Sequence, residues 1–295
     1  MPFYVLGLLD GLKRLQYVED SPENAGTSGR RFVLNLGIGR LPEVKRFARE
    51  FVDKPVDIIF AVATAAVRAA QEETSQSHTP VVFVGVSDPG PSGDRFVDSL
   101  ARPGGHITGV SHQQVQGSGK RVELFKDMMP SLQRLITLRR PGYEPAEKSL
   151  VQVRAAADRL KIDVLDWTAN NREELEAKLA KVDRNTADGI MILPDTVIIS
   201  NVDLVIETSL ERRVPAFALQ DFMARWGAMA AYGPSAYQAG ARAAGYIDKI
   251  SKGVKPGEIP VEPVDPSLVI NLKAAECLGV SLPLTVLHQA DSVIR

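Results

Sequence analysis

The stretch Asp57-Ile58-Ile59-Phe60-Ala61-Val62-Ala63-Thr64-Ala65-Ala66 decides the fold of this chain. Six apolar residues follow Asp57 without polar alternation, which is typical of a strand that is covered on both faces. Residues 64–73 are rich in Ala, Arg, Gln and Glu and predict a helix, with Thr64 placed to cap it. Free backbone N–H groups of this helix are therefore expected at the carboxyl end of the strand, where a parallel sheet usually holds its ligand. The competing interpretation is an ordinary strand-to-helix connection that binds no ligand.

Length and composition indicate a globular protein with two domains or one large domain. The chain has 295 residues, of which 44% are hydrophobic, and single cores rarely grow beyond roughly 250–300 residues. Its 35 Lys and Arg residues balance 36 Asp and Glu residues, so the net charge favours neither nucleic acid nor an anionic membrane as a partner. The one cysteine, Cys277, excludes an internal disulfide and a cysteine-based metal site. The helical pattern of residues 274–278 predicts that this thiol is buried.

The sequence as written predicts neither a membrane span nor a secretory signal peptide. No run approaches the ~20 apolar residues of a transmembrane helix. Residues 1–10 contain an apolar stretch but lack a basic leader and a small-residue cleavage site.

Strand and helix patterns alternate along the chain in two successive cycles. The first predicts helices at residues 8–17, 41–52 and 64–73 and strands at 31–36, 58–63, 81–86 and 107–111. The second predicts helices at residues 120–129, 147–160, 172–182 and 202–212 and strands at 134–138, 163–167, 189–193, 216–219 and 229–232. A helix at 237–251, a mostly extended segment at 259–272 and a short helix at 274–278 follow. This alternation favours parallel sheets with right-handed crossovers, so the predicted fold class is α/β with two similar lobes.

Each predicted strand ends in a short polar or turn-forming segment. These segments lie at residues 63–64, 87–89, 111–112, 139–141, 194–196 and 220–222. Because the carboxyl ends of parallel strands gather at one edge of a sheet, two such edges facing each other would form a ligand cleft. For Asp88, Asp195 or Asp221 taken alone, a turn-forming role is the competing interpretation.

Two adjacent arginines, Arg139 and Arg140, follow a predicted buried strand, where a guanidinium group must find water or an anion. One arginine facing the cleft would favour a carboxylate ligand, and two solvated arginines on the rim are the alternative. An aromatic wall for a planar ligand is a further hypothesis, built from Tyr143, Phe222, Trp226 and Tyr232. Core or hinge packing is the competing interpretation of these four rings.

Enzyme signatures are scarce in this sequence. The histidines show no spacing typical of metal ligands, and no serine has the flanking glycines of a nucleophile elbow. Residues 117–121 resemble the end of a phosphate loop but lack the earlier glycine and a Ser or Thr after Lys120. No catalytic residue, metal ligand or cofactor is predicted.

Several segments together carry a resemblance to a known family. They are residues 11–19, 56–59, 64–66, 88–89, 99–111, 119–124, 232–234 and 268–275. The most specific of them is 100–109, Leu-Ala-Arg-Pro-Gly-Gly-His-Ile-Thr-Gly. Through these segments the chain resembles, over nearly its whole length, the ABC-transporter substrate-binding proteins of the group that includes tryptophan-type binders.

The resemblance implies two Rossmann-like lobes of the type I periplasmic-binding-protein kind, joined by three crossovers near Ser111, Tyr232 and Val264. It assigns residues 1–111 and 234–264 to the N-terminal lobe and residues 112–233 and 265–295 to the C-terminal lobe. The expected function is closure of the hinge around a small carboxylate-bearing solute, an amino acid or an aromatic or organic acid, which is handed to an ABC permease.

By motif match, the family's ligand-contacting positions fall on Thr64, Ser87, Asp88, Arg140, Asp195 and Asp221. The backbone N–H groups of Thr64 and Ala65 are expected to receive a ligand carboxylate, and Asp88 or Asp195 an ammonium group. Phe222 completes the expected site as part of the hypothetical aromatic wall.

Two of the sequence's departures from the family pattern bear on the fold and on the ligand. The family places a leader and a first strand before its first helix, so the first strand of the first lobe is expected to be missing here. The Arg139-Arg140 pair replaces a neutral Tyr-Asn pair, which motivates the hypothesis of an acidic ligand. The resemblance implies a monomeric, periplasmic or otherwise extracytoplasmic binder without catalytic activity, cofactor or nucleic-acid partner. An effector-sensing module of a regulator and an α/β enzyme are the alternatives.

Overall fold

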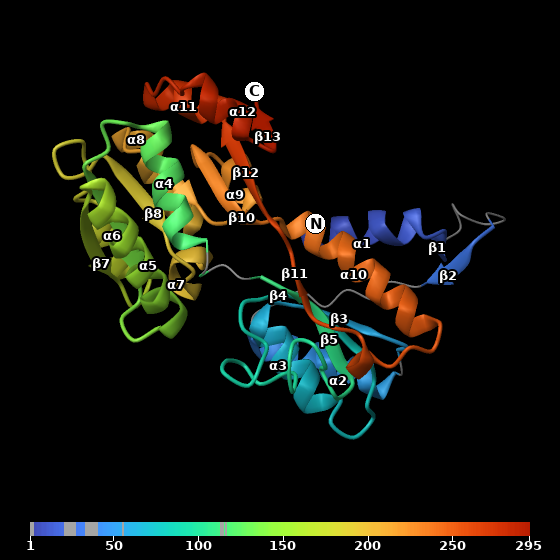
Figure 1. Cartoon of the computed structure of the whole chain (residues 1–295). Coiled ribbons are helices and arrows are strands. Elements are labelled where there is room, and N and C mark those ends of the chain that lie inside the picture. The colour runs from blue at the N-terminus through green and yellow to red at the C-terminus, as the bar shows by residue number, and fades with distance from the viewer. Residues whose placement is uncertain (1–2, 21–27, 33–40, 55, 113–114, 116) are drawn as a thin grey trace. The chain divides into compact units, whose positions relative to one another are not determined.

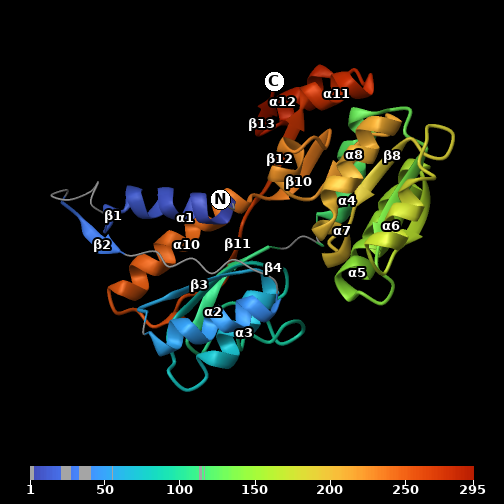
Figure 2. The same cartoon turned by 180° about the vertical axis from the view of Figure 1, so that it is seen from behind.

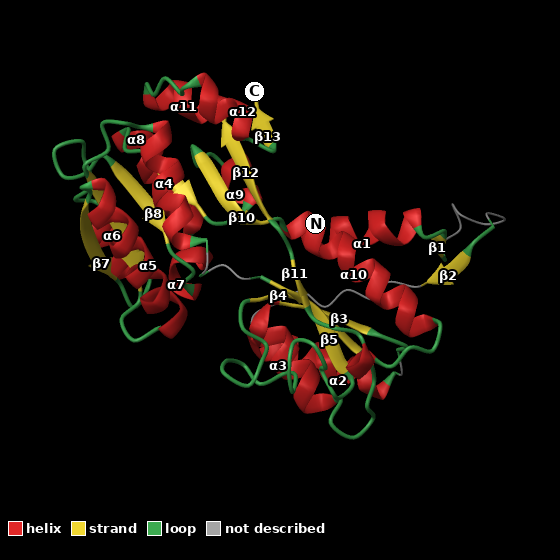
Figure 3. Cartoon of the chain, viewed as in Figure 1, coloured by secondary structure: helices red, strands yellow, loops and turns green. Residues whose placement is uncertain are grey.

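The computed structural model describes residues 3–20, 28–32, 41–54, 56–112, 115 and 117–295, and the statements below refer to these residues. The chain forms two compact units, Met1–Gln113 with Ala236–Val264 (unit 1) and Gln114–Ser235 with Asp265–Arg295 (unit 2). Figure 1 shows the order of the elements along the chain, and Figure 3 shows that each unit combines its own sheet with covering helices. The predicted α/β class is therefore confirmed.

Unit 1 is built around a four-stranded parallel sheet in the order β11-β5-β4-β3. Its elements are α1 (Phe3–Arg14), β1 (Tyr17–Glu19), β2 (Arg30–Phe32), α2 (Leu41–Asp53), β3 (Ile59–Val62), α3 (Ala63–Glu73), β4 (Val81–Val86), β5 (Ile107–Ser111), α10 (Ala236–Ser251), the 3₁₀ helix η2 (Pro256–Glu258) and β11 (Glu262–Pro263). Strands β1 and β2 pair in parallel as a separate two-stranded sheet. The predicted strand at 31–36 begins in β2, and its residues 33–36 lie outside the described part of the chain.

The apolar strand runs of unit 1 are explained by burial on both faces of the sheet. One face packs on α3 and α2, where Phe83 of β4 contacts the cluster that contains Val67 and Ala70. The other face packs on α10, where Val82 and Val84 lie in one cluster with Ala239 and Ala243. A strand covered in this way loses the polar alternation of a half-exposed strand.

Helix α1 lies beside α10 in both views (Figures 1 and 2). Glycines allow this approach: a Cβ atom on Gly240 would lie 1.9 Å from the backbone oxygen of Tyr4, and one on Gly7 would lie 1.9 Å from that of Tyr237. The helix predicted at residues 8–17 begins earlier, at Phe3, and ends at Arg14. Gly11, a weak point by helix propensity, also faces α10, where its Cβ would lie 2.7 Å from that of Ala244.

Unit 2 contains a seven-stranded sheet in the order β13-β12-β10-β9-β8-β6-β7. Its elements are α4 (Ser118–Met128), β6 (Arg134–Arg139), α5 (Glu144–Leu160), β7 (Asp163–Thr168), α6 (Arg172–Leu179), β8 (Gly189–Ile192), α7 (Thr196–Ser200), α8 (Val202–Arg212), β9 (Ala216–Ala218), α9 (Asp221–Arg225), β10 (Ala230–Pro234), β12 (Pro266–Asn271), α11 (Leu272–Leu278), α12 (Leu284–Gln289) and β13 (Ser292–Ile294). One cluster packs α4 and α5 on one face of the sheet, and another packs α6 and α8 on the other.

Two sequence predictions for unit 2 need correction. The sheet is not wholly parallel, because β12 pairs with β10 in the antiparallel direction. The chain passes through unit 1 between these two strands, so the crossover rule for strand-helix-strand units does not govern their direction. Cys277 is exposed rather than buried. Helix α11 buries Ala274, Ala275 and Leu278, and these positions leave Cys277 on the outer side of the helix.

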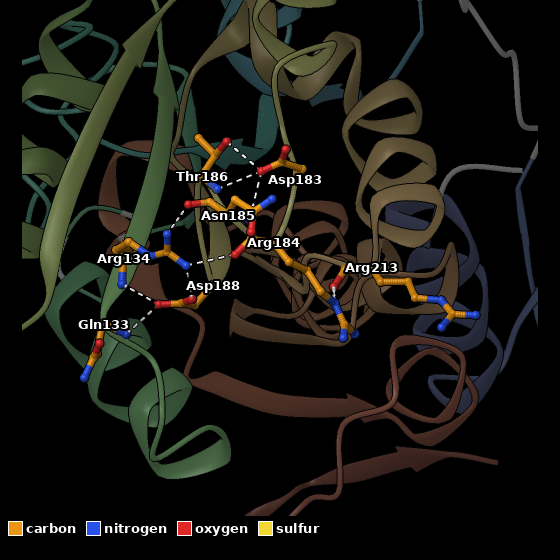
Figure 4. A network of polar contacts seen from close by, with 8 residues as sticks. All are labelled: Gln133, Arg134, Asp183, Arg184, Asn185, Thr186, Asp188 and Arg213. Atoms are coloured by element: carbon orange, nitrogen blue, oxygen red, sulfur yellow. Dashed lines mark hydrogen bonds and ion pairs between the residues drawn. The ribbon is translucent and has the colours of Figure 1, made fainter.

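A polar network ties together the amino ends of β6 and β8 (Figure 4). Asp188 accepts the backbone N–H groups of Gln133 at 3.0 Å and Arg134 at 2.8 Å. The Arg134 guanidinium donates to the Asp188 carboxylate at 2.7 Å and to the backbone oxygens of Arg184 and Asn185. At this edge of the sheet, the charges of the acid and the arginine therefore neutralise each other.

Candidate functional site

The predicted cap of α3 is wrong. The residue before the helix is Val62, in extended conformation, and no side chain caps the helix in the described part of the chain. Thr64 lies inside the first turn, and its hydroxyl donates instead to Asp94 Oδ2 at 3.2 Å. Ala63, between them, has φ 69°, a left-handed conformation that costs a non-glycine residue about 1–2 kcal/mol. Among the described residues, no side chain accepts from the first-turn N–H groups, and Ala65 is exposed beside Thr64.

Asp94 is a site candidate that the sequence did not predict. Its carboxylate accepts from Thr64 and from the Arg68 guanidinium, at 3.2 and 3.1 Å, and its backbone N–H donates to the Asp88 carbonyl at 2.8 Å. Burial raises the pKa of Asp94, although Thr64 and Arg68 oppose the shift. Asp94 belongs to a loop that folds back onto the start of α3, and no local sequence pattern marks such a return.

The predicted pair Ser87 and Asp88 follows β4 and is half-buried. Asp88 accepts from the Gly90 N–H at 3.3 Å and the Ser92 hydroxyl at 3.0 Å, as a turn-forming aspartate does. Through Asp94, the structure brings Asp88 and Thr64 into one cluster at the carboxyl edge of the unit 1 sheet. Contact of this cluster with a ligand stays a prediction.

His112 follows β5 at the same edge and is fully buried. Its Nδ1 lies 3.3 Å from the Tyr4 hydroxyl, and its Nε2 has no hydrogen-bond partner among the described residues. Burial lowers the pKa of His112 to about 4, so the imidazole is neutral at physiological pH. The pair joins the start of α1 to the end of β5.

In unit 2, Asp195 is 1% exposed and acts as a structural acceptor. Its Oδ1 accepts the backbone N–H groups of Val197 and Ile198, which caps α7. Its Oδ2 accepts the backbone N–H of Arg140 at 2.7 Å. The predicted residues Asp195 and Arg140 therefore lie together, at the carboxyl ends of the neighbouring strands β8 and β6.

Asp195→Ala is expected to lower the free energy of unfolding by about 2 kcal/mol, because three backbone donors lose their acceptor. Asp195→Asn keeps an acceptor oxygen and is expected to cost less. Urea denaturation of both variants measures the difference. An alanine variant as stable as the parent would contradict this structural role.

The two adjacent arginines have different environments. Arg139 is the last residue of β6, and its side chain is 15% exposed, as is that of Asp166. Arg139 donates to both Asp166 oxygens at 2.8–3.1 Å, and these hydrogen bonds raise the pKa of Arg139. The Arg140 guanidinium instead lies 4.8 Å from the ring centroid of Tyr143. No carboxylate pairs with it within the described residues.

The third corner of unit 2 contains Asp221 and Phe222. Asp221 accepts the N–H of Phe222 at 2.8 Å and the hydroxyl of Ser235 at 2.7 Å. The Phe222 ring packs edge-on against Trp226, with centroids 4.8 Å apart, and Trp226 is 57% exposed. Of the rings in the hypothetical aromatic wall, Tyr143 contacts Arg140, whereas Phe222 and Trp226 contact each other. The wall, which would also include Tyr232, stays a hypothesis.

Within the described residues, no cluster of His, Cys, Asp and Glu side chains has the geometry to hold a metal ion. None of the described helices is long and apolar enough to cross a membrane. A cavity of ≈ 400 Å³ opens on unit 1 beside Gln71, Phe96 and His106, and none of the eight predicted site residues lines it.

Comparison with known proteins places this geometry in a family context. A tyrosine-binding protein of Clostridioides difficile (strain R20291) is 25% identical over 234 residues, which span 78% of this chain and 65% of that protein's own length. An ABC domain from Streptococcus pneumonia in complex with L-Trp has a TM-score of 0.77 and 23% identity, covering 99% of this chain and 95% of that one. A conserved domain protein from Vibrio cholerae has a TM-score of 0.76 and 28% identity, covering 99% and 94%.

The family comparison extends over almost the whole sequence. The model of the family described as ABC transporter substrate binding protein matches residues 4–294. The structural likeness to these two chains agrees with this match in fold. The chain therefore belongs to the ABC transporter substrate-binding protein family.

Proposed function

We propose that this chain is a solute-binding component of an ABC-type uptake system and binds a small carboxylate-bearing solute, an amino acid or an aromatic or organic acid. The observation that carries the proposal is the family match over residues 4–294. The similarity to a tyrosine-binding protein and to a structure that holds L-Trp supports an amino acid as the solute.

In this proposal each unit contributes the carboxyl edge of its sheet. The uncapped start of α3 in unit 1 offers backbone N–H groups and the positive end of the helix dipole to a carboxylate. Asp88 or Asp94 at the same edge would receive an ammonium group. Arg140, Asp195, Asp221 and Phe222 would supply the contacts from unit 2, either directly or by holding the loops in place.

Binding would act through a change of conformation. A solute that contacts both edges interacts more strongly with the closed arrangement than with the open one, and so shifts the population towards closure. A permease that recognises the closed arrangement would then accept the solute. The protein would act outside the cytoplasm as a monomer, without catalysis, and the hinge would lie at the crossovers near Ser111, Tyr232 and Val264.

The experiment is a thermal-shift screen of the purified chain against amino acids, aromatic acids and dicarboxylates. A solute present at about a hundred times its dissociation constant should add roughly 2.7 kcal/mol to the free energy of unfolding. A hit should be recovered unchanged after incubation, since binding involves no turnover. If no solute in the panel shifts the melting temperature, the proposed function is wrong; a solute that is converted to product would instead favour an enzyme.

A further inference from the structure

We infer that the solute carries an anionic group in addition to the carboxylate that α3 would receive, and that Arg140 stacked on Tyr143 is the residue that selects it. The inference rests on the proposed function and names the class of solute more narrowly: acidic amino acids, dicarboxylates or carboxylated aromatic amino acids.

The first step is that the side chains of the two adjacent arginines have different partners. Arg139 is bound to Asp166 through three hydrogen bonds of 2.8–3.1 Å and lies 3.7 Å from Glu147, so its charge is already balanced. Arg140 points to a different environment, with its guanidinium over the ring of Tyr143. A guanidinium stacked on an aromatic face keeps the N–H groups at its rim available for a planar anion.

The second step concerns the carboxylates at this edge of unit 2. Asp195 accepts three backbone N–H groups and Asp221 accepts one N–H and one hydroxyl. Glu147 accepts the Gly142 N–H at 3.0 Å. Every one of these acids already has donors within the protein, whereas the Arg140 guanidinium has no carboxylate partner among the described residues. The acids keep their negative charge, but among the described residues none of them lies within ion-pair distance of the Arg140 guanidinium, which is therefore available to an anion from a solute.

The third step is how firmly Arg140 is held. Its backbone N–H donates at 2.7 Å to Asp195, which is itself buried and fixed to α7. The stack on Tyr143 limits the remaining freedom of the side chain. A positioned guanidinium loses less entropy when it binds an anion than a free surface arginine does, which favours affinity.

The test compares solutes of nearly identical shape that differ in charge. The probes are L-glutamate against L-glutamine and 4-carboxy-L-phenylalanine against 4-carbamoyl-L-phenylalanine, titrated calorimetrically into the full chain at pH 7.5. At least one anionic member is expected to bind about tenfold to a hundredfold more tightly than its neutral partner, the range for a hydrogen-bonded charge.

Variants then assign the preference to one residue. Arg140→Gln is expected to abolish the preference, and Arg140→Lys to retain part of it, because a lysine keeps the charge without the planar fork. Arg213→Gln is the matched control: Arg213 is an exposed arginine of the same unit at the opposite edge of the sheet, and its side chain points away from the network in Figure 4. This control should keep the full preference.

The outcomes separate the inference from the proposed function. Neutral probes that bind as tightly as the anionic ones, or a preference that survives in Arg140→Gln, would overturn the inference and leave the solute-binding function standing. Absence of binding by all four probes and by every member of the wider panel would overturn both.

Discussion

Gly240→Ala is expected to destabilise unit 1 by about 3 kcal/mol, at the upper end of the usual cost of overpacking. The added methyl group would lie 1.9 Å from the backbone oxygen of Tyr4 and 2.8 Å from the backbone nitrogen of Leu8. These are main-chain atoms of α1, so no side-chain rotation can relieve the clash. The helix itself would have to move off α10, and urea denaturation followed by circular dichroism should show a lower midpoint.

Gly245 on the same helix provides the control. A Cβ atom there meets no atom within 4 Å, so Gly245→Ala should add only helix propensity, about 0.5–1 kcal/mol of stability. If the free energy of unfolding falls in Gly240→Ala and rises in Gly245→Ala, the contact with α1 is identified as the cause. Equal effects of the two substitutions would show that α1 does not pack on Gly240 as described.

The stability of the protein is expected to fall between pH 7.5 and pH 4.5 by about 2.5 kcal/mol because of His112 alone. Burial lowers the pKa of this histidine to about 4 in the folded state, against roughly 6.5 in an unfolded chain. Above pH 7 both states are neutral and the residue contributes nothing. As the pH falls below 6.5, His112 becomes protonated in the unfolded chain but stays neutral in the folded state, so unfolding becomes more favourable.

His112→Phe should remove this part of the pH dependence, even though it also deletes the 3.3 Å contact with Tyr4. Free energies of unfolding for parent and variant, measured from pH 7.5 to 4.5, give the comparison. His288→Gln, at an exposed position, is the control for the loss of an imidazole. A variant with the same pH dependence as the parent would rule out His112 as the source.

Apolar runs in the sequence predicted the central strands of both sheets, but not the edge strands β1 and β13 or the antiparallel direction of β12. The residues of β4 and β8 have no polar alternation, and burial on both faces is the physical reason. Helix ends were harder to predict, because Thr64 looks like a capping residue until the left-handed Ala63 places it inside the first turn. The contact of α1 with α10 was also invisible, since a close approach depends on which face of each helix carries the glycines.

The candidate site was predictable as a set of strand ends but not as a set of roles. Parallel pairing explains why Arg140 and Asp195 lie together, since β6 and β8 are neighbours. Nothing in a dipeptide such as Arg139-Arg140 tells which guanidinium will meet Asp166, because that acid comes from the partner strand β7. Asp94 was missed for a similar reason: its partners Thr64 and Arg68 lie about a whole strand-helix unit away in the sequence.

The central claim is that one solute engages both units and closes them. The distance between the units can be measured by pulsed electron paramagnetic resonance between two spin labels. One label is attached to Cys277, the single cysteine of the chain, which is exposed in unit 2, and the other to an introduced Lys54→Cys in unit 1. A solute that raises the melting temperature should shorten this distance and narrow its distribution. A solute that stabilises the protein but leaves the distribution unchanged would contradict the account.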